Sequence, residues 1–220
     1  MDTHLRRFII SCGLLSLLGL MLFAVGAITN DRLTHVYLFW NLLLAWIPLL
    51  DALLIRYLFK KDMKQPFILV SLAFVWLLFL PNTFYMLTDY VHIMEVARVD
   101  PISDSVMFSV VITTGFILGI ASVFLIHTAL LRIISQRLAA IVIGLVLAAS
   151  SFAIYLGREL RFNSWDIITN PLRLTRDVVH ILFRPHQNID AYVTSLTFFI
   201  VTIVVYALVW YILGTRTKKA

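Results

Sequence analysis

Residues 105–131 read SVMFSVVITTGFILGIASVFLIHTALL and contain no Asp, Glu, Lys or Arg. A helix needs about 20 mostly apolar residues to cross the hydrocarbon core of a bilayer, because its backbone amides must find partners within the segment. Five further stretches meet this test: 8–28, 36–59, 67–87, 139–156 and 191–213. The sequence therefore predicts an all-α protein, a polytopic transmembrane helical bundle of six spans that forms a single domain over residues 1–220.

The composition excludes several other classes of protein. The chain has 220 residues, of which 61% are hydrophobic and 14% charged, and its net charge is +6. Soluble domains are roughly 45–50% apolar and about 25% charged, so a disordered chain and a typical soluble enzyme are both excluded. The single cysteine, Cys12, rules out a disulfide scaffold. The basic residues lie between apolar runs and form no basic face, so we expect no nucleic-acid partner.

The distribution of Lys and Arg predicts how the chain is oriented. Eleven of the 18 lie on the side of the two termini: Arg6, Arg7, Arg56, Lys60, Lys61, Lys64, Arg132, Arg137, Arg216, Lys218 and Lys219. The other seven are spread over longer loops that also carry acids. By the positive-inside rule we expect both termini in the cytoplasm, an uncleaved first span, and loops 88–104 and 157–190 on the outside of a plasma membrane.

Small residues recur at four-residue spacing in two spans. Gly115 and Gly119 form one such pair, and Gly144 and Ala148 form another. Small residues allow helix backbones to approach closely in a membrane. Packing within the chain is the favoured interpretation, and association with a second copy or another membrane protein through Gly115 and Gly119 is the alternative.

Three polar residues lie inside predicted spans. Asn41 and Asp51 belong to the second span and His127 to the fourth, with Asp51 and His127 at comparable depth. Polar residues in a membrane face protein or water and find partners. A buried polar contact between helices is favoured, because no second acid lies nearby. The alternative is a proton or cation relay.

The end of the third span, WLLFLPNTFYMLTDYVH over residues 76–92, is rich in polar side chains. Pro81 predicts a kink or restart of the helix, with Asn82 or Thr83 capping a new helical segment that runs to about Arg98. In that segment one polar stripe comprises Tyr85, Thr88, Asp89, His92 and Glu95. It predicts an interfacial helix or the wall of a wet cavity.

Asp89 and His92 are the candidate catalytic residues, because a carboxylate and an imidazole can exchange protons. Together with Glu95 they could also ligate a divalent metal, but their three-residue spacing spreads them around the helix. Solvated charges on an interfacial helix are favoured, so we predict no metal site. No sequence motif for a cofactor is present, and we predict none.

The end of the fifth span, YLGRELRFNSWD over residues 155–166, carries the candidate ligand-binding residues. Arg158 and Arg161 lie one helical turn apart and suit a phosphate or carboxylate, including that of a lipid headgroup. Pairing with the acids of the two loops is an equal alternative. Trp165 suits an interfacial anchor. The proposed ligand-binding set is Asn82, Arg158, Arg161, Asn163, Trp165 and Asp166.

An amphipathic helix is predicted over residues 171–184, with Asn170 as its cap, Pro171 in its first turn and Pro185 at its end. Its apolar and charged positions separate onto two faces, which is typical of a helix on a membrane surface. It would serve as a lid or an anchor.

Two motifs carry a resemblance to a known family. Trp-Leu-x-Phe-Leu-Pro-Asn with Tyr and Thr-Asp after it, followed by Leu-Gly-Arg-x-x-Arg-x-Asn-Ser-Trp-Asp, resembles the membrane-protein family called domain of unknown function 1361. Family members often have a second proline after the asparagine, where this chain has Thr83-Phe84. The resemblance implies a bacterial multi-span membrane protein and brings no established activity.

Three functions fit these features. The preferred hypothesis is an outward-facing polar pocket for an anionic or lipid-headgroup ligand, built where the third and fifth spans emerge. The second is a small transporter or channel subunit that uses Asn41, Asp51 and His127. The third is a non-catalytic membrane assembly or scaffold protein. Membrane lipids are the expected partners in each case.

Overall fold

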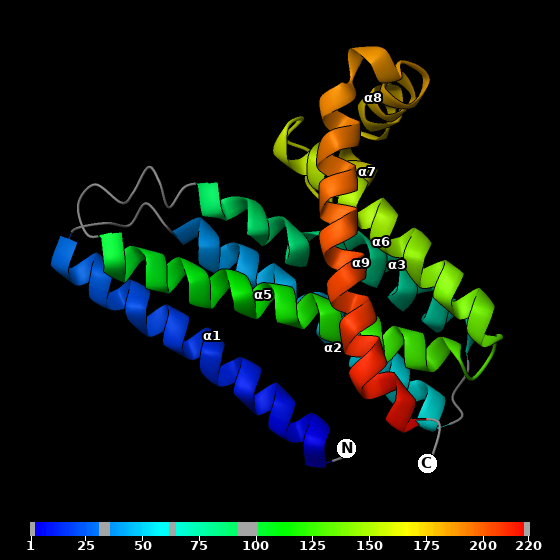
Figure 1. The fold of residues 1–220 in the computed structure, drawn as a ribbon, viewed down its shortest axis with the longest axis horizontal. Helices are drawn as coiled ribbons and strands as arrows, with labels where there is room; N and C mark the ends of the chain where they lie inside the picture. Colours follow the sequence, from blue (N-terminus) through cyan, green and yellow to red (C-terminus); the bar gives the residue numbers. More distant parts are fainter. Residues whose placement is uncertain (1–2, 31–35, 62–64, 92–100, 218–220) are drawn as a thin grey trace.

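The computed structural model describes residues 3–30, 36–61, 65–91 and 101–217, and in these residues all regular secondary structure is helical. Six segments are long and apolar enough to cross a membrane. They are α1 (Thr3–Asn30), α2 (Val36–Lys60), α3 (Pro66–Tyr85) with the 3₁₀ turn η1 (Met86–Asp89), α5 (Pro101–Leu130), α6 (Gln136–Arg158) and α9 (Ile189–Thr217) (Figure 1). The predicted all-α class and its six spans are confirmed.

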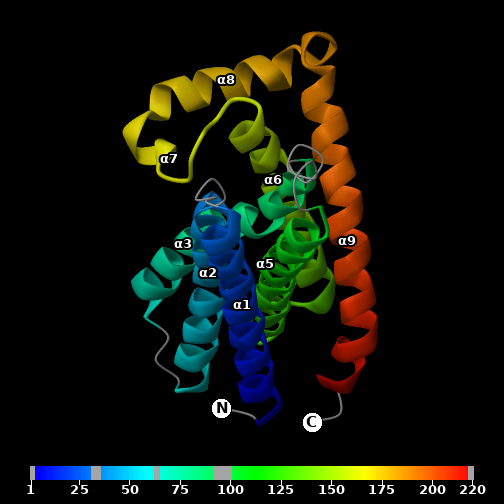
Figure 2. The ribbon, with the colours of Figure 1, turned by 90° about the vertical axis from the view of Figure 1, so that its left-hand side faces the viewer.

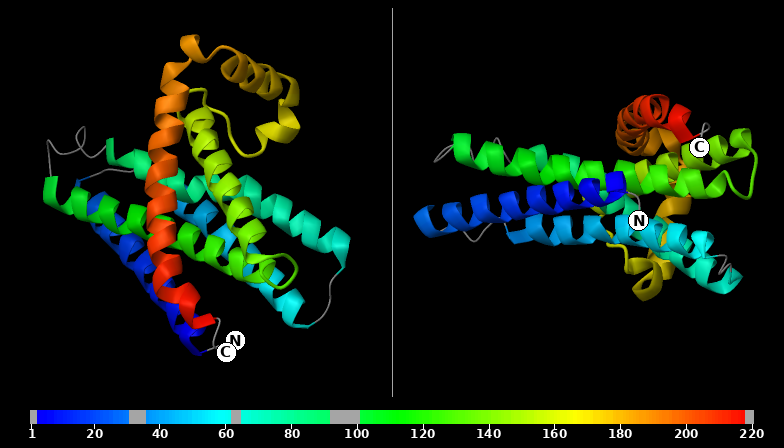
Figure 3. Two further views of the ribbon diagram at one scale, coloured as in Figure 1. Left: turned by 45° about the vertical axis from the view of Figure 1, so that its right-hand side comes forward. Right: turned by 90° about the horizontal axis from the view of Figure 1, so that it is seen from below.

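Helix α5 forms the centre of the bundle and packs most extensively against α2, which also packs against α3. Helix α1 packs on α5, while α6 lies against α3 and α9. The start of α1 and the end of α9 lie at the same end of the molecule, and α8 lies at the opposite end, which we call the α8 end (Figures 2 and 3). The C-terminal ends of α3 and α6 approach each other at the α8 end.

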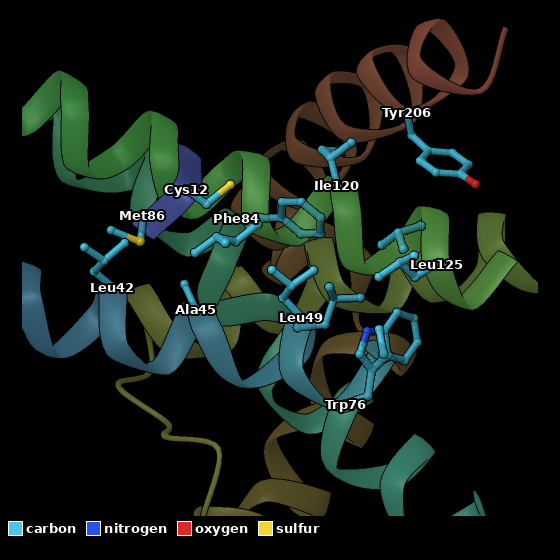
Figure 4. Close-up of a cluster of buried hydrophobic side chains, with 14 of the residues drawn as sticks. Cys12, Leu42, Ala45, Leu49, Trp76, Phe84, Met86, Ile120, Leu125 and Tyr206 are labelled. Carbon is cyan, nitrogen blue, oxygen red and sulfur yellow. The ribbon is translucent and has the colours of Figure 1, made fainter. Parts of the chain in front are cut away.

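The core is formed mainly by α2, α3 and α5. Leu49 of α2 and Leu80 and Phe84 of α3 are fully buried in this core (Figure 4). The indole of Trp76 donates a 3.2 Å hydrogen bond to Ser122 Oγ of α5, which satisfies a donor that would otherwise be orphaned in an apolar interior. This core fixes α3 against the two helices that flank it.

The glycines of α5 mark the closest approach between α5 and the α3–η1 segment. A Cβ atom added to Gly115 would collide with the thioether of Met86, and one added to Gly119 would collide with the Thr83 side chain. Gly144 on α6, in contrast, has nothing within 4 Å of an added Cβ among the described residues. The face of α5 that carries Gly115 and Gly119 is thus occupied by residues of the same chain.

The prediction of a helix restart after Pro81 is wrong. Helix α3 continues through Pro81 to Tyr85 and only then tightens into η1. Neither Asn82 nor Thr83 caps a helix, because the Thr83 hydroxyl donates back to the Leu80 carbonyl at 2.7 Å. Proline is tolerated inside a membrane helix where side-chain groups satisfy the backbone around it. The predicted continuation to Arg98 lies outside the described residues beyond 91.

The 157–190 loop carries α7 (Asp166–Thr169), α8 (Pro171–Phe183) and the 3₁₀ turn η2 (Pro185–Gln187). The predicted amphipathic helix is confirmed as α8, which lies across the bundle end (Figure 2). Its Ile181 is buried in a small cluster with Tyr155 and Leu156 of α6. Asn170 occupies the predicted N-cap position of α8, but its side chain makes no capping hydrogen bond; its amide donates to Asp166 instead.

Candidate functional site

A cavity of about 1160 Å³ lies at the α8 end, between α2, α3 and α6. Helix α3 runs between the other two helices, and the loop from Arg161 to Trp165 covers the cavity together with α7 and Leu174 of α8. The polar side chains that line it are Tyr37, Asn41, Asn82, Tyr85, Asp89, Ser150, Arg161, Asn163 and Ser164. Both sequence motifs therefore contribute to one cavity.

Direct hydrogen bonds join the two motifs. The amide of Asn82 donates to Ser164 Oγ at 3.0 Å, and the Ser164 hydroxyl donates to the Leu78 carbonyl at 3.0 Å. A guanidinium nitrogen of Arg158 donates to the Thr88 carbonyl at 3.0 Å. These three contacts hold the loop after α6 onto the last turns of α3 and η1.

Asp89 lines the cavity and is only 3% exposed. We call the part of the cavity that is lined by Asn41, Asn82, Asp89, Arg161 and Asn163 its polar end. The Asn41 amide donates to one of its carboxylate oxygens at 3.4 Å, which joins α2 to η1. A carboxylate this deep is stabilised by such donors, since burial without them is costly. Asn41, which the sequence groups with Asp51 and His127 as an intramembrane polar residue, therefore contacts Asp89 in the structure.

The two candidate arginines occupy different environments. Arg158 binds the Thr88 carbonyl and has the Glu159 carboxylate 3.8 Å from its Nε, so its charge is partly compensated. Arg161 makes no hydrogen bond or ion pair with the described residues, although it lines the main cavity. Both arginines also line a second hollow of about 520 Å³, which shares Arg161 and Asn163 with the first. Arg161 is the uncompensated cation of this site.

The backbone of Arg161 is in the left-handed region, with φ at 57°. Among the residues that the structure describes, no other residue has a positive φ. The turn that holds it ends α6 and is closed by a 3.1 Å bond from the Phe162 amide to the Leu156 carbonyl. Left-handed backbone costs a non-glycine residue about 1–2 kcal/mol, and such strain is concentrated at functional positions.

Asp166 stabilises the loop and does not line the cavity. Its carboxylate accepts hydrogen bonds from the Asn163 amide at 2.6 Å, the Thr169 hydroxyl at 3.0 Å and the Asn170 side chain at 3.2 Å. The Asn163 backbone donor, followed by the Asn170 amide, lowers the pKa of Asp166 below its ordinary value. Asp166 thus shapes the turn that presents Asn163 to the cavity. Trp165, 45% exposed, contributes directly to the lining.

The remaining candidates lie elsewhere. His92 and Glu95 are outside the described residues, and within residues 3–30, 36–61, 65–91 and 101–217 no group of three His, Cys, Asp or Glu side chains could hold a metal. His127 Nδ1 lies 2.6 Å from Tyr206 Oη, and its ring stacks on Trp210. Asp51 Oδ2 and His127 Nε2 are buried without hydrogen-bond partners in the described structure, and no hydrogen bond joins the two side chains.

A family model matches residues 40–205, which include both motifs and every helix that lines the cavity. The chain belongs to the family described as Protein of unknown function (DUF1361). No curated protein and no solved structure matches the chain. All the residues that line the cavity, except Tyr37, belong to this DUF1361 domain.

Ser164 is the site residue that sequence reasoning missed. It occupies the Asn-Ser-Trp-Asp motif, yet a serine in a loop has no property that identifies its partner 86 residues away at Leu78. Pro81 lacks the amide that would bind the Leu77 carbonyl, whereas Ser164 binds the next carbonyl, that of Leu78. The proline therefore does not identify Ser164 as a partner.

Proposed function

We propose that this multi-pass membrane protein binds an anionic group, of phosphate or carboxylate type, at the polar end of the cavity. Arg161 carries the proposal, because this exposed arginine lines both hollows and makes no hydrogen bond or ion pair with the described residues. A guanidinium offers five donors in a planar fork that matches such oxyanions. Asn82 and Asn163 flank it and supply neutral hydrogen-bonding groups.

The site would face the outside of a bacterial plasma membrane, with both termini in the cytoplasm. The excess of Lys and Arg on the side of the termini supports this orientation. The common end of the bundle occupied by the start of α1 and the end of α9 is consistent with it (Figure 2). Asp89 and His92 remain the candidates for acid–base chemistry beside the bound anion.

The proposal is tested by comparing two lipids that share their chains and differ in their heads. The full-length protein is purified in maltoside detergent, and native mass spectrometry measures the binding of dioleoyl phosphatidate against dioleoyl phosphatidylcholine. We expect a preference for phosphatidate that Arg161→Gln reduces about tenfold or more, since a charge-assisted hydrogen bond contributes about 1.5–3 kcal/mol.

Arg176→Gln provides the matched control, because Arg176 is an exposed arginine on α8 that lines neither hollow. Its lipid preference should equal that of the wild type. An equal loss in both variants would show a general effect of basic charge and would overturn the assignment to Arg161.

A second candidate, a transporter or channel subunit, has support from Asp51 Oδ2 and His127 Nε2. Both atoms are buried in spans without a described partner, as expected of groups that exchange a proton or cation. Proteoliposome flux that depends on Asp51 is the measurement that favours it.

A further inference from the structure

The cavity extends well below its polar end, along the part of the bundle that lies in the hydrocarbon core. On α3 its lining runs from Tyr85 down to Phe74, about 16 Å along the helix axis at 1.5 Å per residue. Half of the hydrocarbon core is about 15 Å thick. The cavity therefore has the depth of one bilayer leaflet.

The lower part of the cavity is apolar and adjoins the bilayer. Phe74 and Leu77 of α3 line it and are 47% and 41% exposed. Because these residues belong to membrane-spanning helices, lipid chains are what their exposed surfaces contact. A hydrocarbon chain can reach the cavity sideways without passing through water.

Helix α6 provides a trough along this wall. Ala149, Ala153 and Gly157 follow one another at four-residue spacing and all line the cavity. Small residues at this spacing usually allow a second helix to approach, but here they border open volume. Beside them Ser150 Oγ is buried and has no partner in the described structure, which leaves one donor in an apolar wall.

The volume also exceeds what an inorganic anion needs. Sites for drug-sized ligands are about 300–1,000 Å³, and this cavity is about 1160 Å³. We infer that the ligand is an amphiphilic lipid with an anionic head, whose head binds at Arg161 and whose hydrocarbon chain lies in the trough between α2, α3 and α6. The inference rests on the proposed function for its head and adds the chain and the route of entry.

The test measures how much the lipid's hydrocarbon chain contributes to binding, separately from its anionic head. Ala149→Trp fills the trough, and Ala140→Trp is the matched control, because Ala140 is also an exposed alanine of α6 but does not line the cavity. With dioleoyl phosphatidate as the probe, we expect Ala149→Trp to weaken binding about tenfold or more and Ala140→Trp to leave it unchanged. Glycerol 3-phosphate, which has the head without the chains, should bind at least about a hundredfold more weakly than phosphatidate.

The two possible failures are distinguishable. If glycerol 3-phosphate displaces phosphatidate at similar concentration and Ala149→Trp binds as the wild type does, the chain site is overturned while the anion site at Arg161 stands. If Ala149→Trp weakens binding but Arg161→Gln does not, the head assignment fails, and with it the inference as a whole. Circular dichroism and gel filtration of each variant establish that it is folded.

Discussion

Asn82 and Ser164 are 82 residues apart in the sequence, and a 3.0 Å hydrogen bond joins their side chains. The Ser164 hydroxyl also binds the Leu78 carbonyl, one turn before Asn82 in α3. Pro81 lies in this same turn and lacks the amide that would bind the Leu77 carbonyl, next to the carbonyl that Ser164 binds. Ser164 thus attaches to α3 beside the helical bond that Pro81 removes, and it positions the loop that carries Arg161 and Asn163.

Removing this hydroxyl should loosen the loop. We expect Ser164→Ala to lower the free energy of unfolding by about 1–2 kcal/mol, because the Asn82 amide loses its acceptor in a half-buried site. Denaturant unfolding in detergent measures the loss. Ser71→Ala is the control, since Ser71 bonds only within its own exposed helix turn and should change stability by less than about 0.5 kcal/mol. Equal losses in the two variants would contradict the role assigned to Ser164.

The spans could be predicted from the sequence because their signal is local: each is an apolar run of the length that a bilayer demands. Helix α8 was predictable for the same reason, since its two faces alternate within its own residues. The contact of Ser164 with the Leu78 carbonyl of α3 was not predictable, because the two residues lie in distant segments of the sequence. The same is true of Asn41, whose contact with Asp89 arises only when α2 and η1 pack together.

The glycines of α5 give a prediction about packing. We expect Gly119→Ala to destabilise the monomer by about 1–3 kcal/mol, because the new methyl group would meet Thr83 and Phe84 in a close-packed interface. Gly144→Ala should leave stability unchanged or raise it by up to about 1 kcal/mol, since the space beside it is open and alanine favours helix. Thermal unfolding at several protein concentrations is the measurement. A Gly119→Ala effect that appears only as lost oligomer would favour an interface between copies.

The turn at Asp166 should depend on pH. Its folded pKa is lowered, chiefly by the Asn163 amide, so the stabilisation is complete above the unfolded pKa of about 3.9 and is lost as the pH falls through the lower folded value. Hydrogen exchange of the Asn163–Asn170 peptide, corrected for intrinsic rate, should therefore accelerate only below about pH 4. Asp166→Asn should exchange rapidly at all these pH values. A wild-type profile that stays flat through this range would contradict the prediction.

A substitution at Asp51 distinguishes a structural role of this carboxylate from a role in relaying protons or cations. Its Oδ2 has no described partner, so replacing the carboxylate by a neutral amide of the same shape removes a charge without breaking a known bond. We expect Asp51→Asn to fold in normal yield, with an unfolding free energy equal to that of the wild type within about 0.5 kcal/mol, or greater. Loss of ion flux in proteoliposomes with folding intact would instead assign Asp51 to transport.

Arg161→Gly should separate stability from binding. Glycine adopts the left-handed backbone at φ 57° without the penalty of about 1–2 kcal/mol that arginine bears, while the unfolded chain gains entropy that offsets part of this relief. The unfolding free energy should therefore stay within about 1 kcal/mol of the wild type or exceed it. Phosphatidate binding should nevertheless fall about tenfold or more, because the uncompensated guanidinium is gone. A variant that loses stability and binding in proportion would mean that Arg161 holds the turn together, and that its strained backbone does not serve a ligand.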